Sequence, residues 1–209
     1  MQAAIVGNEQ QKCKVDGCYT TRWRISGYCQ HHSDNQQRWG HPEGLDIPDA
    51  RLTIAFDQIQ KVIAANPEHK GIAIGKRFFE QWMVVAVATI KLSPPMVPTG
   101  RHLVRLADFN VHPLDCLTVV GSVWLFATRD RGRFVKGDEH TRAVMGQKLF
   151  ALAPMRGEHQ KTGQERKAAG KYIQDSIGVL LVTLADAVEQ MEQRGQTRLK
   201  AMGSALDIP

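Results

Sequence analysis

Three cysteines and a histidine near the N-terminus have the residue types and the spacing of a metal site. Together they form the pattern Cys13-x4-Cys18-x10-Cys29-x2-His32. Zinc takes thiolate and imidazole ligands in tetrahedral geometry, and closely spaced ligand pairs on a tight turn can converge on one ion. The sequence therefore predicts one structural Zn²⁺ with these four ligands. His31 and His41 are alternatives to His32 as the fourth ligand.

Such a site is not expected to catalyse a reaction. An ion held by three thiolates and one imidazole has no open coordination position and cannot activate water. The chain also contains no nucleophile elbow, no P-loop, no dinucleotide-binding glycine motif and no His-Glu-x-x-His motif. His112 lies in a predicted loop, and His140 lies in the acidic N-terminus of a predicted helix. We therefore expect no enzymatic activity.

The N-terminal motif resembles the small zinc modules of phage and mobile-element proteins, including modules associated with HNH homing endonucleases. The resemblance rests on the cysteine and histidine pattern, on Gly27 before Cys29 and on the run Arg38-Trp39-Gly40-His41-Pro42. It covers residues 13–44 only, and it implies a treble-clef-like fold of zinc knuckle, short hairpin and helix. The catalytic histidine, asparagine and metal-binding histidine of an HNH nuclease are not recognisable.

The predicted zinc module carries cations and aromatic rings that could contact nucleic acid. Three arginines are candidate phosphate contacts: Arg22, Arg24 and Arg38. Trp23 and Trp39 could stack on bases. Small domains need aromatic residues in their cores, however, so we expect both rings to be buried. Residues 1–50 hold five Lys or Arg and six Asp or Glu, so the module is not a basic clamp.

After Gly44 the apolar residues follow helical spacing, and nothing alternates convincingly with the period of a strand. Helices are expected at about 49–66, 72–91, 114–128, 137–153 and 165–193. The predicted fold class is therefore mainly α: an N-terminal treble-clef-like zinc finger followed by a helical domain of about five helices. We place the zinc-binding module with its linker at residues 1–48 and the helical domain at residues 49–209.

Two of these helices should lie at the centre of the core. The helix at 114–128 is almost wholly apolar, and its Cys116 is expected to be a packing residue. The helix at 72–91 is apolar on nearly all sides in its C-terminal half. Its expected inner face consists of Ile74, Phe78, Trp82, Val85 and Thr89. The prolines and the glycine of residues 93–100 indicate a loop after it.

The chain is basic, with 27 Lys or Arg against 21 Asp or Glu. The excess is concentrated between residues 129 and 171, which hold eleven basic and five acidic residues. The candidate nucleic-acid contacts of this segment are Arg129, Arg131, Arg133, Lys136, Lys161, Arg166 and Lys167. Basic residues in glycine-bearing loops commonly bind phosphate backbones. A solvated basic surface without a partner is the alternative.

Three interpretations of function remain open. The first is a non-enzymatic, zinc-stabilised accessory or regulatory protein of a phage or mobile element that binds nucleic acid, which we expect to be DNA. The second is a protein-binding adaptor or inhibitor of a host enzyme complex, and the third is a degenerate HNH-like nuclease. No apolar run is long enough to span a bilayer and no secretory signal is visible. We therefore expect a cytoplasmic protein without a membrane partner.

Overall fold

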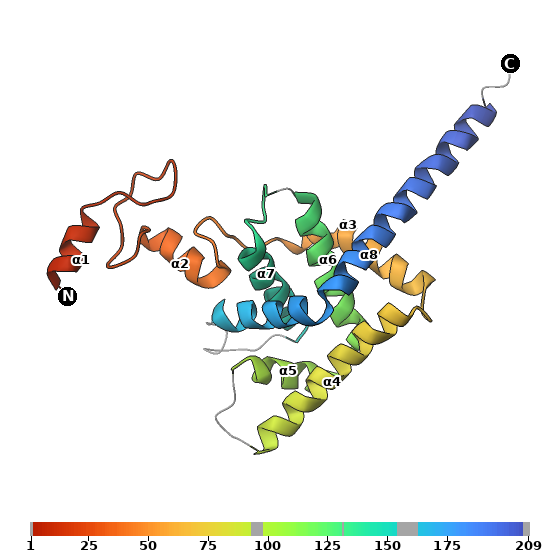
Figure 1. The fold of residues 1–209 in the computed structure, drawn as a ribbon, viewed down its shortest axis with the longest axis horizontal. Coiled ribbons are helices and arrows are strands. Elements are labelled where there is room, and N and C mark those ends of the chain that lie inside the picture. Colours follow the sequence, from red (N-terminus) through yellow and green to blue (C-terminus); the bar gives the residue numbers. More distant parts are fainter. Residues whose placement is uncertain (1, 93–97, 131, 154–162, 207–209) are drawn as a thin grey trace.

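The computed structural model describes residues 2–92, 98–130, 132–153 and 163–206. Over these residues the protein is built from eight helices and contains no β-sheet (Figure 1). The helices are α1 (Gln2–Glu9), α2 (Gln30–Trp39), α3 (Asp49–Ala65), α4 (Lys70–Leu92), α5 (Pro98–Asp108), α6 (Pro113–Asp130), α7 (Asp138–Ala151) and α8 (Gly163–Leu206). The prediction of a mainly α protein is confirmed. None of the described helices combines the length and the apolarity that a bilayer span requires.

The four predicted metal ligands lie at one end of an elongated molecule. Residues 2–44, which we call the finger, contain α1, an irregular segment and α2, and they lie to one side of the other helices (Figure 1). The expected hairpin is reduced to a single antiparallel bridge between Lys12 and Thr21. Helices α3–α8 form the helical body, from which the C-terminal part of α8 projects at the end opposite the finger (Figure 1).

Helix α6 is the centre of the helical body, as its composition predicts. It contacts α3, α4, α7 and α8, and Leu117, Val120 and Val123 are completely buried. Cys116 is also completely buried, and burial raises the pKa of its thiol to about 12. A thiol with so high a pKa stays protonated, so Cys116 is a packing residue.

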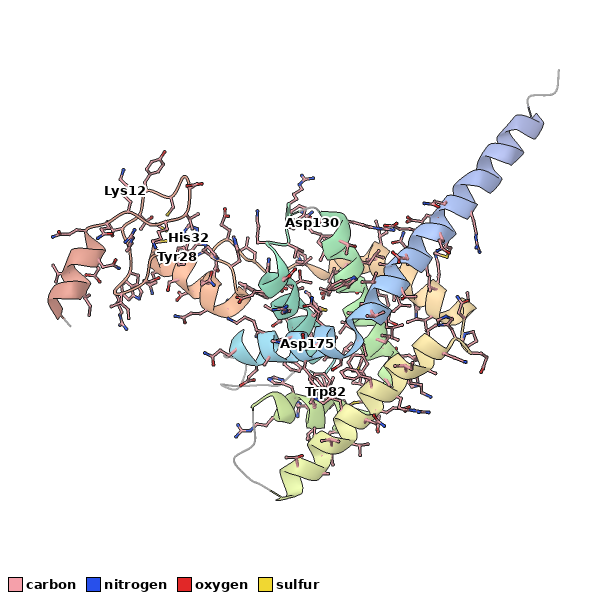
Figure 2. All side chains as sticks on the ribbon, viewed as in Figure 1. Lys12, Tyr28, His32, Trp82, Asp130 and Asp175 are labelled. Carbon is pink, nitrogen blue, oxygen red and sulfur yellow. The ribbon has the colours of Figure 1, made fainter. Side chains whose placement is uncertain are left out.

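Helix α4 is not central, and its predicted inner face is only partly correct, because Phe78 and Trp82 pack against the core without being fully buried. The side chains that are fully buried come from an adjacent face of the helix: Ile72, Phe79, Met83 and Ala86. Ile74 and Val85 are exposed, and Trp82 is only partly buried, against Tyr172 of α8 with the ring centroids 5.0 Å apart (Figure 2). Gly75 explains which face of α4 is buried, because side chains of α6 and α8 pack against the position where a β-carbon would lie. A β-carbon there would lie 2.7 Å from a methyl group of Leu180.

Helix α5 occupies part of the segment that was predicted to be a loop. It begins at Pro98, and proline is well tolerated at the start of a helix because the first amides have no helical partner there. Leu103 and Leu106 bury their side chains in the core. The loop prediction is therefore wrong from Pro98 onward, while residues 93–97 lie outside the described part of the chain.

Helix α8 is bent, and its N-terminal part packs on α7 backbone against backbone. The bend lies at Ile177, whose φ of −128° and ψ of 17° leave the helical region next to Gly178. A β-carbon on Gly146 of α7 would lie 2.1 Å from the carbonyl oxygen of Arg166, and one on Gly170 of α8 would lie 2.0 Å from that of Arg142. Only glycine allows this approach.

Candidate metal centre

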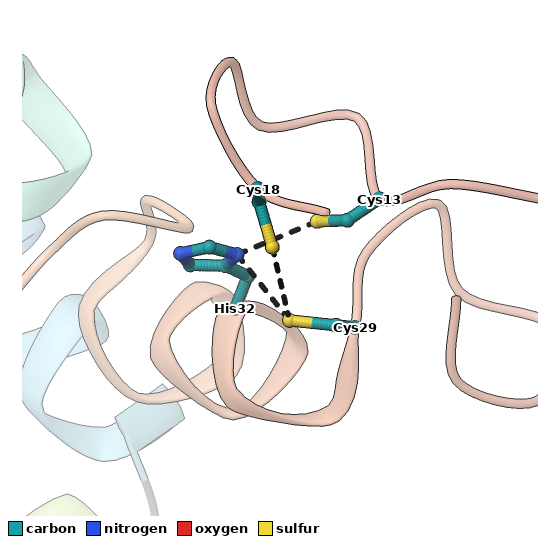
Figure 3. Close-up of side chains that lie close together, drawn as sticks. All are labelled: Cys13, Cys18, Cys29 and His32. Carbon is teal, nitrogen blue, oxygen red and sulfur yellow. Dashed lines mark hydrogen bonds between the residues drawn. The ribbon is translucent and has the colours of Figure 1, made fainter. Parts of the chain in front are cut away.

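The four predicted ligand atoms converge on one point (Figure 3). The Sγ atoms of Cys13, Cys18 and Cys29 and a ring nitrogen of His32 all lie within 4.8 Å of one another. His32 Nδ1 is 3.4 Å from Cys13 Sγ and 3.3 Å from Cys29 Sγ, and the Sγ atoms of Cys18 and Cys29 are 3.9 Å apart. Tetrahedral zinc, bonded at about 2.3 Å to sulfur and about 2.0 Å to nitrogen, sets its ligand atoms about 3.5–3.8 Å apart. The donor set therefore fits one such ion.

Cys13 and Cys18 lie on a turn that brings their thiols together. The amide of Cys18 donates to the carbonyl of Val15, and Gly17 between them has a φ of 76°, a conformation that favours glycine. The amide of Cys13 donates to the carbonyl of Thr20 across the turn. A hydrogen bond from the backbone of Thr20 lowers the pKa of the Cys18 thiol. The turn therefore favours the thiolate form that binds metals.

The second ligand pair is positioned by the start of α2. Cys29 is the N-cap residue, and its carbonyl accepts the amide of Ser33, so His32 lies in the first turn beside it. Burial raises the pKa of the Cys29 thiol, an effect that a bound cation would oppose. His31 Nε2 instead lies 3.2 Å from the side-chain Nδ2 of Asn35, and His41 Nδ1 accepts the backbone amide of Glu43 in the turn after α2. His32 is thus the histidine of the cluster.

The other end of α2 belongs to the core of the helical body. Trp39 is only 5% exposed, but it is buried in the core of the helical body and not in a core of the finger, and its ring meets the ring of His140 edge to face at 6.0 Å. Gly40 ends the helix with a φ of 75°, and a β-carbon there would lie 2.8 Å from Cβ of Glu139 in α7. One short helix therefore carries a candidate metal ligand in its first turn and a core tryptophan in its last.

Both histidines that could suggest a catalytic group have structural contacts. His140 is completely buried, its Nδ1 accepts the amide of Lys136, and its Nε2 lies 2.8 Å from the carbonyl of Leu45. These partners require a neutral ring with the proton on Nε2, and burial lowers the pKa of His140 accordingly. His112 Nδ1 accepts the amide of Leu114 at the start of α6.

Trp23 differs from its prediction, because it is 38% exposed. It lies in the irregular segment of the finger, where the Arg24 guanidinium carbon is 5.1 Å from the ring centroid. Arg22 folds back and donates from Nε to the carbonyl of Lys12, whereas Arg38 is exposed near the end of α2. A bound ion would replace the apolar core that so small a unit otherwise needs, so folding of the finger would not require Trp23 to be buried.

The predicted phosphate contacts of the helical body differ in their exposure and in whether they already form an ion pair. Arg129 donates to both carboxylate oxygens of Glu192, at 2.9 and 3.4 Å. Arg166 is partly buried against the Trp39 ring, and burial lowers its pKa. Three others have exposed or partly exposed side chains: Arg133, Lys136 and Lys167. Two lie outside the described residues: Arg131 and Lys161. The sequence could not indicate the Arg129 contact, because its partner lies 63 residues away.

Comparisons of the chain with family models, with curated proteins and with solved structures found no match. The metal centre therefore rests on the chemistry and the convergence of its own donor atoms. Those atoms form a candidate metal site of three cysteines and one histidine. Helices α3–α8 follow it in the chain.

Proposed function

We propose that the protein is a non-enzymatic, zinc-stabilised accessory protein of a phage or mobile element that binds nucleic acid, and DNA in particular. The observation that carries this proposal is the surface of the finger. Lys12, Lys14 and Arg24 are exposed there, and none of the ion pairs found among the described residues involves them. The proposed ion is Zn²⁺, because three thiolates and one imidazole are a ligand set typical of structural zinc.

Unpaired cations on a metal-organised surface are suited to bind phosphate. Contacts from Lys and Arg to phosphates supply most of the sequence-independent affinity of nucleic-acid-binding proteins. The partly or fully exposed Arg133, Lys136 and Lys167 of the helical body would add to the same attraction. The net charge of +6 acts in the same direction over longer distances.

Binding of labelled oligonucleotides, measured by fluorescence anisotropy over a salt series, tests this function. We expect affinity to fall steeply with salt. The combined replacement Lys12→Gln, Lys14→Gln and Arg24→Gln should reduce the slope of log K against log salt by about 2 to 3 units, since each lost phosphate contact contributes about 0.9. The matched control is the triple replacement Lys61→Gln, Lys70→Gln and Arg77→Gln, which removes the same charge from exposed positions on α3 and α4. No binding at low salt would refute the proposal.

A protein-binding adaptor is the second candidate, and exposed apolar residues of the helical body favour it. Val84, Val85 and Val179 are all well exposed on α4 and α8. Exposed apolar side chains can contribute to a protein–protein contact. In this case Val85→Ser and Val179→Ser should abolish recovery of a host protein from lysate, while the triple replacement in the finger should leave it unchanged.

A further inference from the structure

The surface of the finger carries two aromatic rings that the metal centre does not use. Tyr19 is 83% exposed and Trp23 is 38% exposed. Each ring has a cation beside it: Lys12 Nζ is 5.8 Å from the Tyr19 centroid, and the Arg24 guanidinium carbon is 5.1 Å from the Trp23 centroid. Small domains normally bury their aromatic residues. Two exposed rings with adjacent cations in one finger therefore indicate a ligand surface.

The backbone under Trp23 is held in place before any ligand arrives. The amide of Trp23 donates to the carbonyl of Tyr28, and the amide of Ser26 donates to the carbonyl of Trp23. The side-chain amide of Asn8 donates to the carbonyls of Arg24 and Ser26, both at 2.7 Å. A ring on so restrained a loop loses little conformational entropy when a ligand binds it.

Arg24 has a backbone conformation that is unusual for its residue type. Its φ is 50°, in the left-handed region that favours glycine. The side chain of Asn8 donates to the carbonyl of Arg24, and the backbone amide of Arg24 lies 3.4 Å from a carboxylate oxygen of Glu9. Strained residues of this kind persist where surrounding contacts hold them, and they cluster at binding sites. In this backbone conformation the guanidinium of Arg24 lies beside the Trp23 ring.

Lys12 provides the corresponding cation for Tyr19. It lies on the finger, away from the helical body (Figure 2). The bridge from Lys12 to Thr21 and the hydrogen bond from Cys13 to Thr20 tie the backbone at Lys12 to the segment that carries Tyr19. Both ring–cation pairs are therefore supported by the backbone that also positions the metal ligands.

Aromatic rings with neighbouring cations match the chemistry of unpaired nucleotides. A base stacks on a ring through its π-face, and a cation binds the adjacent phosphate. Bases in an intact duplex are already stacked on one another and offer no free face. We propose that Tyr19 and Trp23 stack on unpaired bases, so that the finger prefers single-stranded nucleic acid to duplex. This inference rests on the proposed nucleic-acid-binding function and specifies its substrate.

The test compares affinities for a labelled dT oligonucleotide, a U oligonucleotide and a duplex of the same length, by anisotropy at fixed salt. Tyr19→Ala and Trp23→Ala should each weaken single-strand binding about 10-fold or more, the effect of losing one base stack, and should leave duplex binding nearly unchanged. Tyr19→Phe and Trp23→Phe should retain most of the affinity. Binding of the dT or of the U oligonucleotide distinguishes DNA from RNA, and either supports the proposal.

The control is an exposed ring–cation pair elsewhere in the molecule. Phe109 of α5 is 54% exposed, with the Arg105 guanidinium carbon 4.7 Å from its ring centroid. Phe109→Ala should leave all affinities unchanged. Bound zinc, measured in every variant, shows whether the finger is intact.

Three outcomes would overturn the inference. If duplex binds as tightly as single strands and the alanine variants change neither, stacking is refuted while nucleic-acid binding stands. If no oligonucleotide binds at low salt, both proposals fail. If anionic phosphatidylserine vesicles bind through Tyr19 and Trp23 and oligonucleotides do not, the rings belong to a membrane surface instead.

Discussion

The Nε2 atom of His140 donates a hydrogen bond across 2.8 Å to the carbonyl oxygen of Leu45, and so ties α7 to the segment that leaves the finger. The other ring nitrogen accepts the amide of Lys136, and the side chain is completely buried beside Trp39. A protonated ring would lose the acceptor at Nδ1 and place a charge in this apolar environment. The junction between finger and body therefore depends on a neutral histidine.

The first prediction concerns the pH dependence of stability. Burial lowers the pKa of His140 below the value of 6.5 expected in the unfolded chain. On acidification the unfolded chain therefore binds this proton first. The contribution of His140 is complete above about pH 6.5 and is lost as the pH falls towards the lowered pKa of the folded protein.

Thermal unfolding of wild type and His140→Gln at pH 7.5 and pH 5.5 measures this effect. Protons would also compete with a metal bound at the candidate site, so the informative quantity is the difference between the two proteins. We expect His140→Gln to lower stability at pH 7.5 and to show a smaller loss on acidification. His69→Gln, at an exposed position, is the control. Equal pH slopes in wild type and His140→Gln would contradict the prediction.

The second prediction concerns metal content. Protein purified without chelator should contain one zinc ion per chain, and Cys13→Ser or Cys29→Ser should lose it. Zinc affinity should fall steeply as the pH drops, because protons compete for three thiolates. Elemental analysis measures the content, and Cys116→Ser, at a buried position away from the cluster, should retain the ion. Wild-type protein without zinc would contradict this prediction.

The third prediction is that removal of the metal destabilises the helical body as well as the finger. The sequence analysis divides the chain into a module at residues 1–48 and a helical domain at residues 49–209, but α2 links His32 to Trp39 in the core of the helical body. Chelation should therefore lower the thermal midpoint of the helical body as well as disorder the finger. Trp39→Ala should cost about 3–5 kcal/mol of unfolding free energy, and the exposed Trp23→Ala less than about 1 kcal/mol. Circular dichroism melts with and without chelator measure both effects, and an unchanged midpoint would show that the two parts are uncoupled.

The fourth prediction concerns the contact between α7 and α8. Gly146→Ala and Gly170→Ala should each destabilise the protein by more than about 3 kcal/mol, because the new methyl group would overlap a backbone carbonyl of the neighbouring helix. Gly195→Ala is the matched control on α8. Nothing lies within 4 Å of the β-carbon it adds, so it should stabilise the helix by about 0.5–1 kcal/mol. Chemical denaturation measures all three, and similar values at the three positions would refute the close crossing.

The fifth prediction is the absence of nuclease activity. Incubated with DNA or RNA and with Mg²⁺ or Mn²⁺, the protein should cleave neither, since a closed Cys3His ion cannot activate water. The exposed His112 is the residue to replace as a check, because His112→Ala leaves the core intact. Cleavage that disappears in that variant would favour the degenerate nuclease.

The sequence determined those features that depend on neighbouring residues. The four ligands could be identified because the convergence of Cys13 with Cys18 and of Cys29 with His32 is a property of one turn and one helical turn. The central place of α6 could be predicted because its residues are apolar in every direction. These inferences need no knowledge of where distant segments lie.

Tertiary structure alone decided which of several equivalent surfaces is buried. Residues Trp82 to Ile90 of α4 are apolar on nearly all sides and carry no periodic signal, so the packing of α6 and α8 against Gly75 selected the inner face. Trp39 and Trp23 both lie beside arginines in the sequence, yet one enters the core beneath α7 and α8 and the other faces solvent. The physical reason is that burial depends on partners such as His140 and Arg166, which lie more than a hundred residues away along the chain.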